Sequence, residues 1–296
     1  MKDREDCVAA AYVEACLAEL DALKPGNVHR LAPGHGMTLA DFVLSAEASS
    51  GPIAARGARV GVRIRNAVGA TLSAVGQNTN LGIILLCAPL AAAAEIADVE
   101  LRPALAAALD SLDQADAADA FAAIAAANPG GLGRVPRHDV EAPAIVTLRE
   151  AMAEAADRDR IARQYVTAYE DVFSLGLPSL MAARERRSDP RWATAAVYLA
   201  FLAAMPDTHV LRKFGAAIAE AIRLEAAEWR AALAAADDPE ELIEGLLKWD
   251  ASLKWRGINP GTSADMTVAT LFASRLSSKR CDKSAATILP SRAKNG

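Results

Sequence analysis

Helical periodicity runs through almost the whole chain and is the feature that most constrains its fold. Alanine is the dominant residue, and no stretch alternates apolar and polar residues as a half-buried strand would. Near the start, five apolar residues recur at the spacing of one helix face: Val8, Ala11, Tyr12, Ala15 and Leu20. With 52% hydrophobic residues, the chain carries enough apolar surface to offset the entropy of folding. These patterns predict an all-α protein.

Helix-start and helix-stop residues divide the chain into successive helices. Thr38 and Asp41 have the spacing of a capping box, and Gly51-Pro52 is expected to end the helix that follows. The expected helices cover residues 3–22, 38–50, 59–75, 81–97, two segments within 101–127, then 143–156, 158–174, 190–204, 210–236, 239–255 and 263–276. The loops are too short for a linker, so we expect one multi-helix domain over 1–276 and a disordered polar tail over 277–296.

Charge and hydropathy exclude several classes of partner. The 32 basic and 37 acidic residues give a net charge of −5, which argues against a general nucleic-acid or phospholipid binder. The most apolar run, 81–94, is shorter than the roughly 20 residues of a membrane span. The first six residues are charged, unlike a secretory signal. We therefore expect a cytoplasmic protein that binds small molecules, with no membrane or nucleic-acid partner, and the sequence is compatible with a homo-oligomer.

Polar, glycine-bearing loops stand out because a core of alanine and leucine does not need them. They are K-P-G-N-V-H-R at 24–30, G-H-G-M at 34–37, G-Q-N-T-N-L-G at 76–82, D-T-H at 207–209 and N-P-G-T-S-A-D at 259–265. The four histidines all lie in polar loops: His29, His35, His138 and His209. A single loop histidine is usually an ordinary surface residue, but the shared placement of all four is a signal for phosphate contacts or acid–base roles.

The loop at 76–80 precedes the buried helix expected at 81–97. The first amides of a helix lack partners within it and carry a positive dipole, so an anion such as phosphate would fit there. Ordinary capping by Asn78 or Thr79 is the alternative, and the spacing alone favours it.

Three loop carboxylates have a similar pair of alternatives. Asp207 and Asp265 each lie beside the start of an expected helix, and Asp41 belongs to the capping box. Each could simply cap a helix. If they converge, they would instead hold Mg²⁺ and, through it, the phosphates of a nucleotide. Glu19, near the end of the first helix, is either a solvated surface residue or a catalytic base.

Taken in order, the loops resemble the motifs of the triphosphoribosyl-dephospho-CoA synthase family. The matching segments are Lys24-Pro25-Gly26, Asn78-Thr79, Asp207-Thr208 and Pro260-Gly261-x-Ser263-Ala264-Asp265, which are similar to P-K-P-G-L-V-D, G-x-N-T-H-K-G, D-T-N and S-P-G-G-x-A-D. The resemblance implies an all-α transferase that depends on ATP and magnesium. It would join ATP to 3′-dephospho-CoA, release adenine and make the precursor of an acyl-carrier prosthetic group.

The same resemblance implies roles for individual residues. Asp207 and Asp265 would hold magnesium or act as base, with Asp41 as a third candidate metal ligand. His35 and His209 would be candidate acids, and Lys24 would neutralise phosphate. The residues expected to bind the nucleotide are Lys24, Gly26, Asn27, Asn78, Thr79, Asn80, Gly261 and Ser263.

The chain departs from the family pattern at four positions, which leaves the acceptor open. These are His29 for an aspartate, Asn80 and Leu81 for histidine and lysine, and His209 for an asparagine. The segments K-P-G-N-V-H-R and G-H-G-M-T-L-A-D-F are similar to a divergent branch of the family linked to one-carbon metabolism. That branch implies a different acceptor, in the biosynthesis of a tetrahydromethanopterin- or methanofuran-type cofactor. A non-catalytic helical module that binds nucleotides or another partner is the third alternative.

Overall fold

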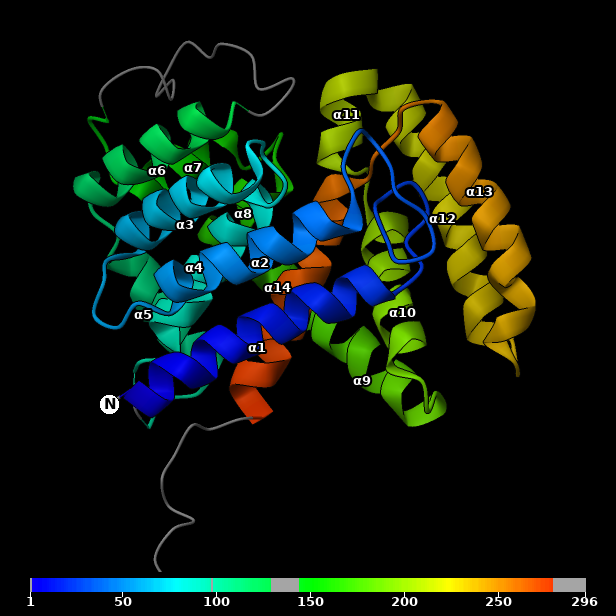
Figure 1. Ribbon diagram of the computed structural model, residues 1–296, viewed down its shortest axis with the longest axis horizontal. Coiled ribbons are helices and arrows are strands. Elements are labelled where there is room, and N and C mark those ends of the chain that lie inside the picture. The colour runs from blue at the N-terminus through cyan, green and yellow to red at the C-terminus, as the bar shows by residue number, and fades with distance from the viewer. Residues whose placement is uncertain (1, 97, 129–143, 279–296) are drawn as a thin grey trace, which may run out of the picture.

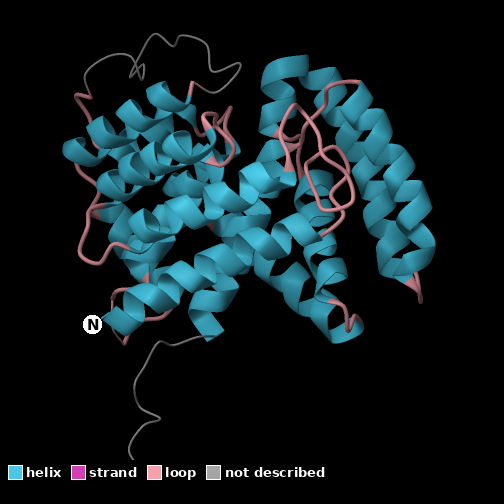
Figure 2. Cartoon of the chain, in the orientation of Figure 1, coloured by secondary structure: helices cyan, strands magenta, loops and turns pink. Residues whose placement is uncertain are grey.

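The described part of the chain, residues 2–96, 98–128 and 144–278 of a computed structural model, is built from helices and contains no strand longer than an isolated bridge (Figures 1 and 2). Its α-helices are α1 (Lys2–Asp21), α2 (Leu39–Ala54), α3 (Val60–Val75), α4 (Leu81–Ala93), α5 (Leu101–Asp110), α6 (Gln114–Ala127), α7 (Leu148–Ala155), α8 (Arg160–Thr167), α9 (Leu177–Arg186), α10 (Pro190–Ala204), α11 (Thr208–Phe214), α12 (Ala216–Ala235), α13 (Ile243–Trp255) and α14 (Gly261–Ser278). A π-helix, Val172–Gly176, leads into α9, and a 3₁₀ turn, Pro239–Leu242, precedes α13. The all-α prediction is confirmed.

Several helix boundaries differ from the prediction. The helix expected over 210–236 is two helices, because Gly215 adopts a φ of +85° between α11 and α12. The helix expected over 158–174 ends at Thr167, where Ala168 and Tyr169 take positive φ. The sequence predicts no helix at α9, whose only buried residue, Leu180, leaves too weak an apolar period.

Four further boundaries moved by a few residues. The second helix continues through Pro52 to Ala54, α4 stops at Ala93, and α7 begins after the capping box of Thr147. The last helix begins at Gly261, so Ser263 lies inside its first turn and is not its cap. This helix also reaches Ser278, whereas the rest of the expected tail, 279–296, and His138 lie outside the described residues.

Two hydrophobic clusters form the core. The larger one surrounds α4, in which every residue except Gly82 and Ala92 is buried. The smaller one joins α10, α12 and α13. Helix α14 serves both, since its Ala264 packs in the smaller cluster and its Met266 in the larger. Figure 1 accordingly shows α3–α8 on one side, α11–α13 on the other, and α14 passing between them.

No single helix in the described ranges is both long and apolar enough to cross a membrane. Helices α10 and α11 meet the length and composition test only when they are taken together as a bent pair. Most of α10 is buried in the protein core, which accounts for its apolar composition.

The loop between α1 and α2 is attached to α13 and α10. The amide of Gly26 donates to Asp250 Oδ1 at 2.8 Å, and the Tyr198 hydroxyl donates to the carbonyl of Pro25 at 2.7 Å. Gly26 has a φ of +85°, and a Cβ there would lie 2.8 Å from Pro260. The loop at 24–30 therefore packs directly on the loop that begins α14.

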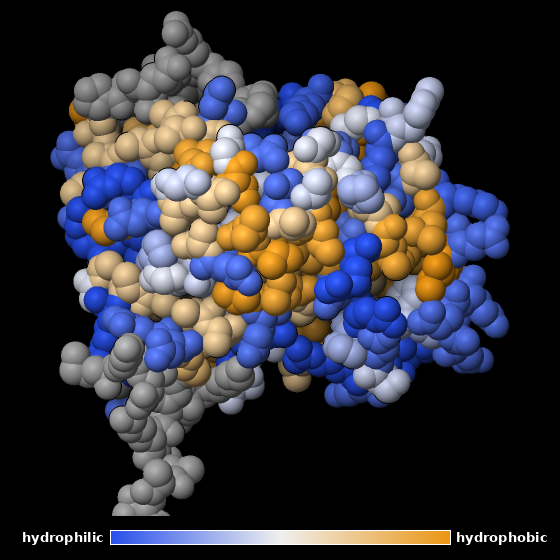
Figure 3. Space-filling model, viewed as in Figure 1, coloured by the Kyte–Doolittle hydropathy of each residue, from blue (hydrophilic) through white to orange (hydrophobic). Residues whose placement is uncertain are grey.

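Hydrophobic side chains gather on one face of the molecule, over α1, α2 and the loop that joins them (Figure 3). The large exposed apolar side chains of these segments are Leu31, 54% exposed, and Leu44, 48% exposed. Apolar surfaces of this kind often form contacts between proteins. The homo-oligomer stays a prediction.

Candidate active site

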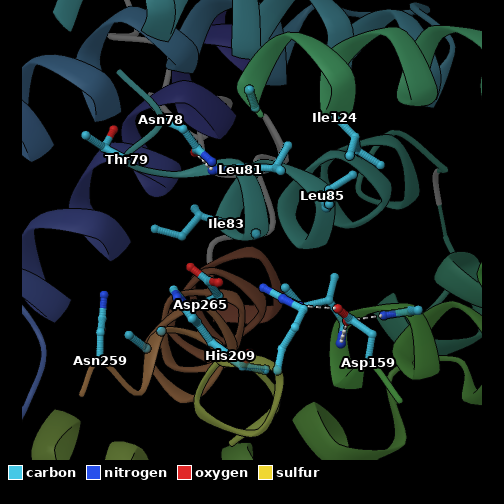
Figure 4. A pocket seen from close by; sticks show the side chains of 18 of the residues that line it. Asn78, Thr79, Leu81, Ile83, Leu85, Ile124, Asp159, His209, Asn259 and Asp265 are labelled. Atoms are coloured by element: carbon cyan, nitrogen blue, oxygen red, sulfur yellow. Dashed lines mark hydrogen bonds and ion pairs between the residues drawn. The ribbon is translucent and has the colours of Figure 1, made fainter. Parts of the chain in front are cut away.

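A cavity of about 830 Å³ lies between the two sides of the fold. One wall comes from α4, α6, α7 and α8, and the facing wall comes from α11, the start of α14 and the loop between α1 and α2. Figure 4 shows Asn78, Leu81 and Ile83 opposite Asp265, His209 and Asn259. The volume is within the range of small-molecule sites, and polar groups converge on a largely apolar surface.

The cavity separates the predicted site residues into two groups. Those that line it are Asn27, His35, Asn78, Thr79, His209, Gly261 and Asp265. Those that lie outside its wall are Lys24, Gly26, Asp41, Asn80, Asp207 and Ser263. Apart from Asp41, the second group contacts residues of the first or holds their loops in place through hydrogen bonds and packing.

Asp265 has the environment of a functional carboxylate. It lies in the second turn of α14, and its carboxylate faces the first turn of α4 so closely that a Cβ on Gly82 would overlap Oδ2 (Figure 4). No described residue donates a hydrogen bond to it. Burial and the neighbouring carboxylates of Glu19 and Asp207 raise the pKa of Asp265 well above its usual range. Such an unpaired acid in a cavity is a candidate for proton transfer or metal binding.

Glu19 is another carboxylate of the cavity wall, and Lys24 holds it in place. The two form a buried ion pair, and Lys24 Nζ also donates to Asn27 Oδ1 at 3.1 Å and to the Val28 carbonyl at 2.8 Å. Three acceptors occupy the three N–H groups of the ammonium. Lys24 therefore orients Glu19 and Asn27 and has no donor left for the predicted phosphate contact. Burial raises the pKa of Glu19, and the ion pair opposes that shift.

Asp207 binds the starts of two helices and does not line the cavity. Its Oδ1 accepts from the amides of His209 and Val210 at 2.9 and 3.2 Å, which caps α11. Its Oδ2 accepts from the amide and the hydroxyl of Ser263 at 2.7 and 2.8 Å, which fastens α14 to α11. All four bonds saturate the carboxylate, so the geometry favours the capping alternative over a metal or base role for Asp207.

Asp41 and Asn78 also cap helices. Asp41 and Thr38 form the predicted capping box of α2, away from the cavity wall, so capping accounts for Asp41 better than metal binding does. Asn78 Oδ1 accepts from the Leu81 amide at 3.1 Å at the start of α4. Among the described residues, however, no acceptor pairs with the next two amides, those of Gly82 and Ile83. An anion could still approach this helix end.

Thr79, Asn80 and Asn27 build the polar rim of the cavity. Thr79 Oγ1 donates to Ser45 Oγ at 2.6 Å, and the buried Asn80 amide reaches Ser49 Oγ at 3.3 Å, so both tie the 76–80 loop to α2. Asn27 Nδ2 donates to Asn259 Oδ1 at 2.8 Å, which joins the loops on either side of the cavity mouth.

The two cavity histidines differ in their partners. His35, at a φ of +57°, contacts the Gly26 carbonyl through Nε2 at 2.8 Å, so that nitrogen carries a proton. His209 packs against Gly261, and its buried Nε2 has no partner among the described residues. Burial and the nearby cations Lys213 and Arg212 lower the pKa of His209 to about 4. A histidine with that pKa is neutral at pH 7.

The cavity includes charged residues that the sequence analysis missed. Asp159 caps α8 with Oδ1, and its Oδ2 pairs with Arg212 at 3.1 Å. Arg158 and Lys213 line the same end of the cavity. Arg212 follows His209 by three residues, so their shared helix face was a signal that could have been used.

A comparison with protein families decides the class of this protein. A family model described as ATP:dephospho-CoA triphosphoribosyl transferase matches residues 5–284. The chain belongs to this family. Members of the ATP:dephospho-CoA triphosphoribosyl transferase family are transferases that act on these two nucleotides, and this chain is accordingly a nucleotide-dependent transferase.

A solved structure shows the same fold as this triphosphoribosyl transferase family member. It is a protein from Archaeoglobus fulgidus whose crystal structure carries the name of a triphosphoribosyl-dephospho-CoA synthase. The two chains are 24% identical, with a TM-score of 0.59, over 81% of this chain and 99% of the other. No curated protein matches this chain.

The departures from the triphosphoribosyl transferase motifs fall in two places. His29 and Asn80 are buried outside the cavity wall, and His29 Nε2 lies 3.4 Å from Asp250. Leu81 and His209 line the cavity. Only the second pair changes the surface that a substrate would meet.

The donor set of the cavity fits a magnesium ion that arrives with a nucleotide. Within residues 2–96, 98–128 and 144–278, no group of three or more His, Cys, Asp or Glu side chains is placed to hold a metal. Magnesium is nevertheless commonly bound by one or two carboxylates together with substrate phosphates and waters. The unpartnered Asp265 oxygens and the neighbouring Glu19 match that requirement.

Proposed function

We propose that this protein transfers the triphosphoribosyl group of ATP to a hydroxyl of 3′-dephospho-CoA and releases adenine, in a reaction that requires magnesium. The observation that carries the proposal is the Asp265 carboxylate, which is half-buried, has no hydrogen-bond partner among the described residues and is turned into a nucleotide-sized cavity. Family membership supplies the two substrates, and the cavity supplies the groups that the chemistry needs.

The reaction replaces the bond from the ribose C1′ to adenine by a bond from C1′ to the acceptor oxygen. Positive charge develops at C1′ as adenine leaves, as it does in glycoside transfer. The acceptor hydroxyl must also lose its proton. A carboxylate beside C1′ serves both needs, because it stabilises the positive charge and can take up the proton. The departing adenine gains one proton in turn, which balances the proton lost by the acceptor.

Asp265 is the residue that we assign to proton uptake. Its raised pKa makes it a stronger base than an exposed aspartate, and its oxygens are free of protein donors. Glu19 is held by Lys24 and serves as the second, oriented carboxylate. This pairing takes the place of the Asp207–Asp265 pair that the sequence suggested.

Magnesium, when bound, would neutralise charge on the triphosphate. Glu19 and one oxygen of Asp265 would hold it, which leaves the second Asp265 oxygen for the acceptor proton. The amide side chains at the cavity rim, Asn27, Asn78 and Asn259, suit hydrogen bonds to ribose or phosphate oxygens. The neutral His209 can donate or accept one hydrogen bond but carries no proton to release as an acid at pH 7.

The experiment that tests this function measures free adenine by chromatography after incubation with ATP, magnesium and dephospho-CoA. We expect adenine only when all three are present, and loss of product when magnesium is chelated. Asp265→Asn should abolish release, and Asp237→Asn, which changes an exposed aspartate away from the cavity, should not. Adenine release by Asp265→Asn at the wild-type rate would contradict the assignment.

A second candidate is the same transfer to a different acceptor, in assembly of a one-carbon cofactor. The observation in its favour is that Leu81 and His209, two departures from the family motifs, line the cavity. It predicts that ATP binds, as measured by calorimetry, while dephospho-CoA fails to trigger adenine release. Absence of any nucleotide binding would favour the non-catalytic module instead.

A further inference from the structure

Basic and imidazole side chains gather at one end of the cavity. His209, Arg212 and Lys213 come from α11, and Arg158 comes from the turn before α8. Apolar side chains of α6, α7 and α8 also line the cavity: Phe121, Ile124, Met152 and Ile161. The cavity thus combines cationic and apolar side chains.

Two polar atoms on this wall are buried and have no partner among the described residues. They are His209 Nε2 and Arg212 Nε. The residues are three apart on α11, so they share one helix face. Buried polar atoms are nearly always paired in native proteins, and unpaired ones mark places where water, an ion or a ligand completes the structure. Both orphaned atoms lie on side chains that line the cavity.

Carboxylates pair with only some of the cations on this wall. Arg212 Nη1 pairs with Asp159 Oδ2 at 3.1 Å, which keeps the guanidinium at the cavity surface. Lys213 and Arg158 are exposed and have no carboxylate partner in the described ranges. Arg158 makes one hydrogen bond, from Nη1 to the Glu154 carbonyl at 2.7 Å. Unneutralised cations around a cavity favour an anionic ligand.

The cationic wall adjoins the proposed catalytic carboxylate. His209 Nδ1 would lie 2.6 Å from a Cβ on Gly261, and Gly261 and Asp265 are one turn apart on α14. Figure 4 shows His209 and Asp265 on the same side of the cavity, with Asp159 further along. A ligand that spans the two would place an anionic group on α11 and its other end at Asp265.

We propose that this wall is the polyphosphate subsite: Arg212, Lys213 and Arg158 bind the triphosphate, and the orphaned His209 Nε2 and Arg212 Nε complete their hydrogen bonds to its oxygens. This assignment rests on the proposed function and fixes the direction of the nucleotide in the cavity. The ribose lies toward Asp265. It also moves phosphate binding from Lys24, which the sequence suggested, to a group that includes Arg212 and Lys213 of α11, which no motif marked.

The test uses inorganic triphosphate and adenosine as separate probes in calorimetry. Lys213→Gln is the primary variant because Lys213 is exposed, so we expect the substitution to leave the fold intact. We expect triphosphate affinity to fall at least tenfold with adenosine affinity unchanged, and the salt dependence of triphosphate binding to become shallower. Arg212→Lys should keep part of the affinity that Arg212→Gln loses. Arg186→Gln, another exposed arginine outside this cavity, should bind like wild type.

The outcomes separate this inference from the proposed function. Unchanged triphosphate affinity in Lys213→Gln and Arg212→Gln would overturn the subsite, even if wild type releases adenine. An equal loss of adenosine affinity would also overturn it, since that result indicates general damage. Loss of triphosphate binding in both variants, in a protein that never releases adenine, would support the subsite and reject the proposed reaction.

Discussion

Asp207 and Asp265 lie next to each other in space but belong to different environments. Asp207 accepts from the amide of Ser263, two residues before Asp265, at 2.7 Å. Asp207 is saturated with protein donors, whereas Asp265 has none and faces the cavity. The two acidic residues therefore differ: Asp207 caps and joins helices, whereas Asp265 faces the cavity without a protein partner.

Replacing Asp207 by alanine should reduce stability more than ligand affinity. The change strands four donors at the starts of α11 and α14, so we expect the free energy of unfolding to fall by about 2 kcal/mol or more. Urea titration followed by circular dichroism measures this loss. Residual folded protein should bind ATP with near wild-type affinity. A variant with unchanged stability and no ATP binding would restore a ligand role for Asp207.

Gly82→Ala should displace the Asp265 carboxylate. A Cβ at position 82 would overlap Oδ2, so the acid must move away from α4. We expect the rate of adenine release to fall at least tenfold, with little change in the helical circular-dichroism signal. Gly69→Ala on α3 is the matched control, because nothing lies within 4 Å of a Cβ there. Equal activity of the two variants would argue that the position of Asp265 is unimportant.

Asp265 should make the protein less stable as pH rises. Its pKa in the folded state is higher than in the unfolded chain, so the folded state binds the proton more tightly. The free energy of unfolding therefore decreases as pH increases between those two pKa values. Asp265→Asn removes this effect, and we expect it to be more stable than wild type at pH 7 while inactive. If the free energy of unfolding changed with pH in the same way in both proteins, that result would contradict the raised pKa of Asp265.

Lys24→Met should leave Glu19 as a buried, unpaired charge. Breaking one partner of a buried ion pair typically costs about 3–5 kcal/mol. We expect a large drop in the unfolding midpoint, and the double variant Lys24→Met, Glu19→Gln should recover much of it. If Lys24 instead bound phosphate, the single variant would keep its stability and lose triphosphate affinity in calorimetry.

Local signals in the sequence were sufficient for most of the fold. Helix periods, the capping box of Thr38 and Asp41, and Gly76 at the end of α3 are all encoded within a few residues. The break at Gly215 was harder to predict, since a single glycine inside a helical pattern is often tolerated. Helix α9 buries too little apolar surface for its pattern to be recognised.

The site was harder to predict because it depends on contacts between distant residues. Asp207 and Ser263 are 56 positions apart, and no local pattern reveals that one saturates the other. The buried pairing of Lys24 with Glu19 likewise requires the loop at 24–30 to fold back on α1. Motif order did bring Asn27, Asn78, His209 and Asp265 to one cavity, because each motif lies near a helix end that faces the cavity.

The cavity separates two hydrophobic clusters that share only a few elements, notably α14. A nucleotide bound between α4 and α11 would contact both clusters. It would therefore link two parts of the core that otherwise share few elements. Bound substrate would then stabilise the folded enzyme that consumes it. The folded state would lose this stabilisation briefly in each turnover.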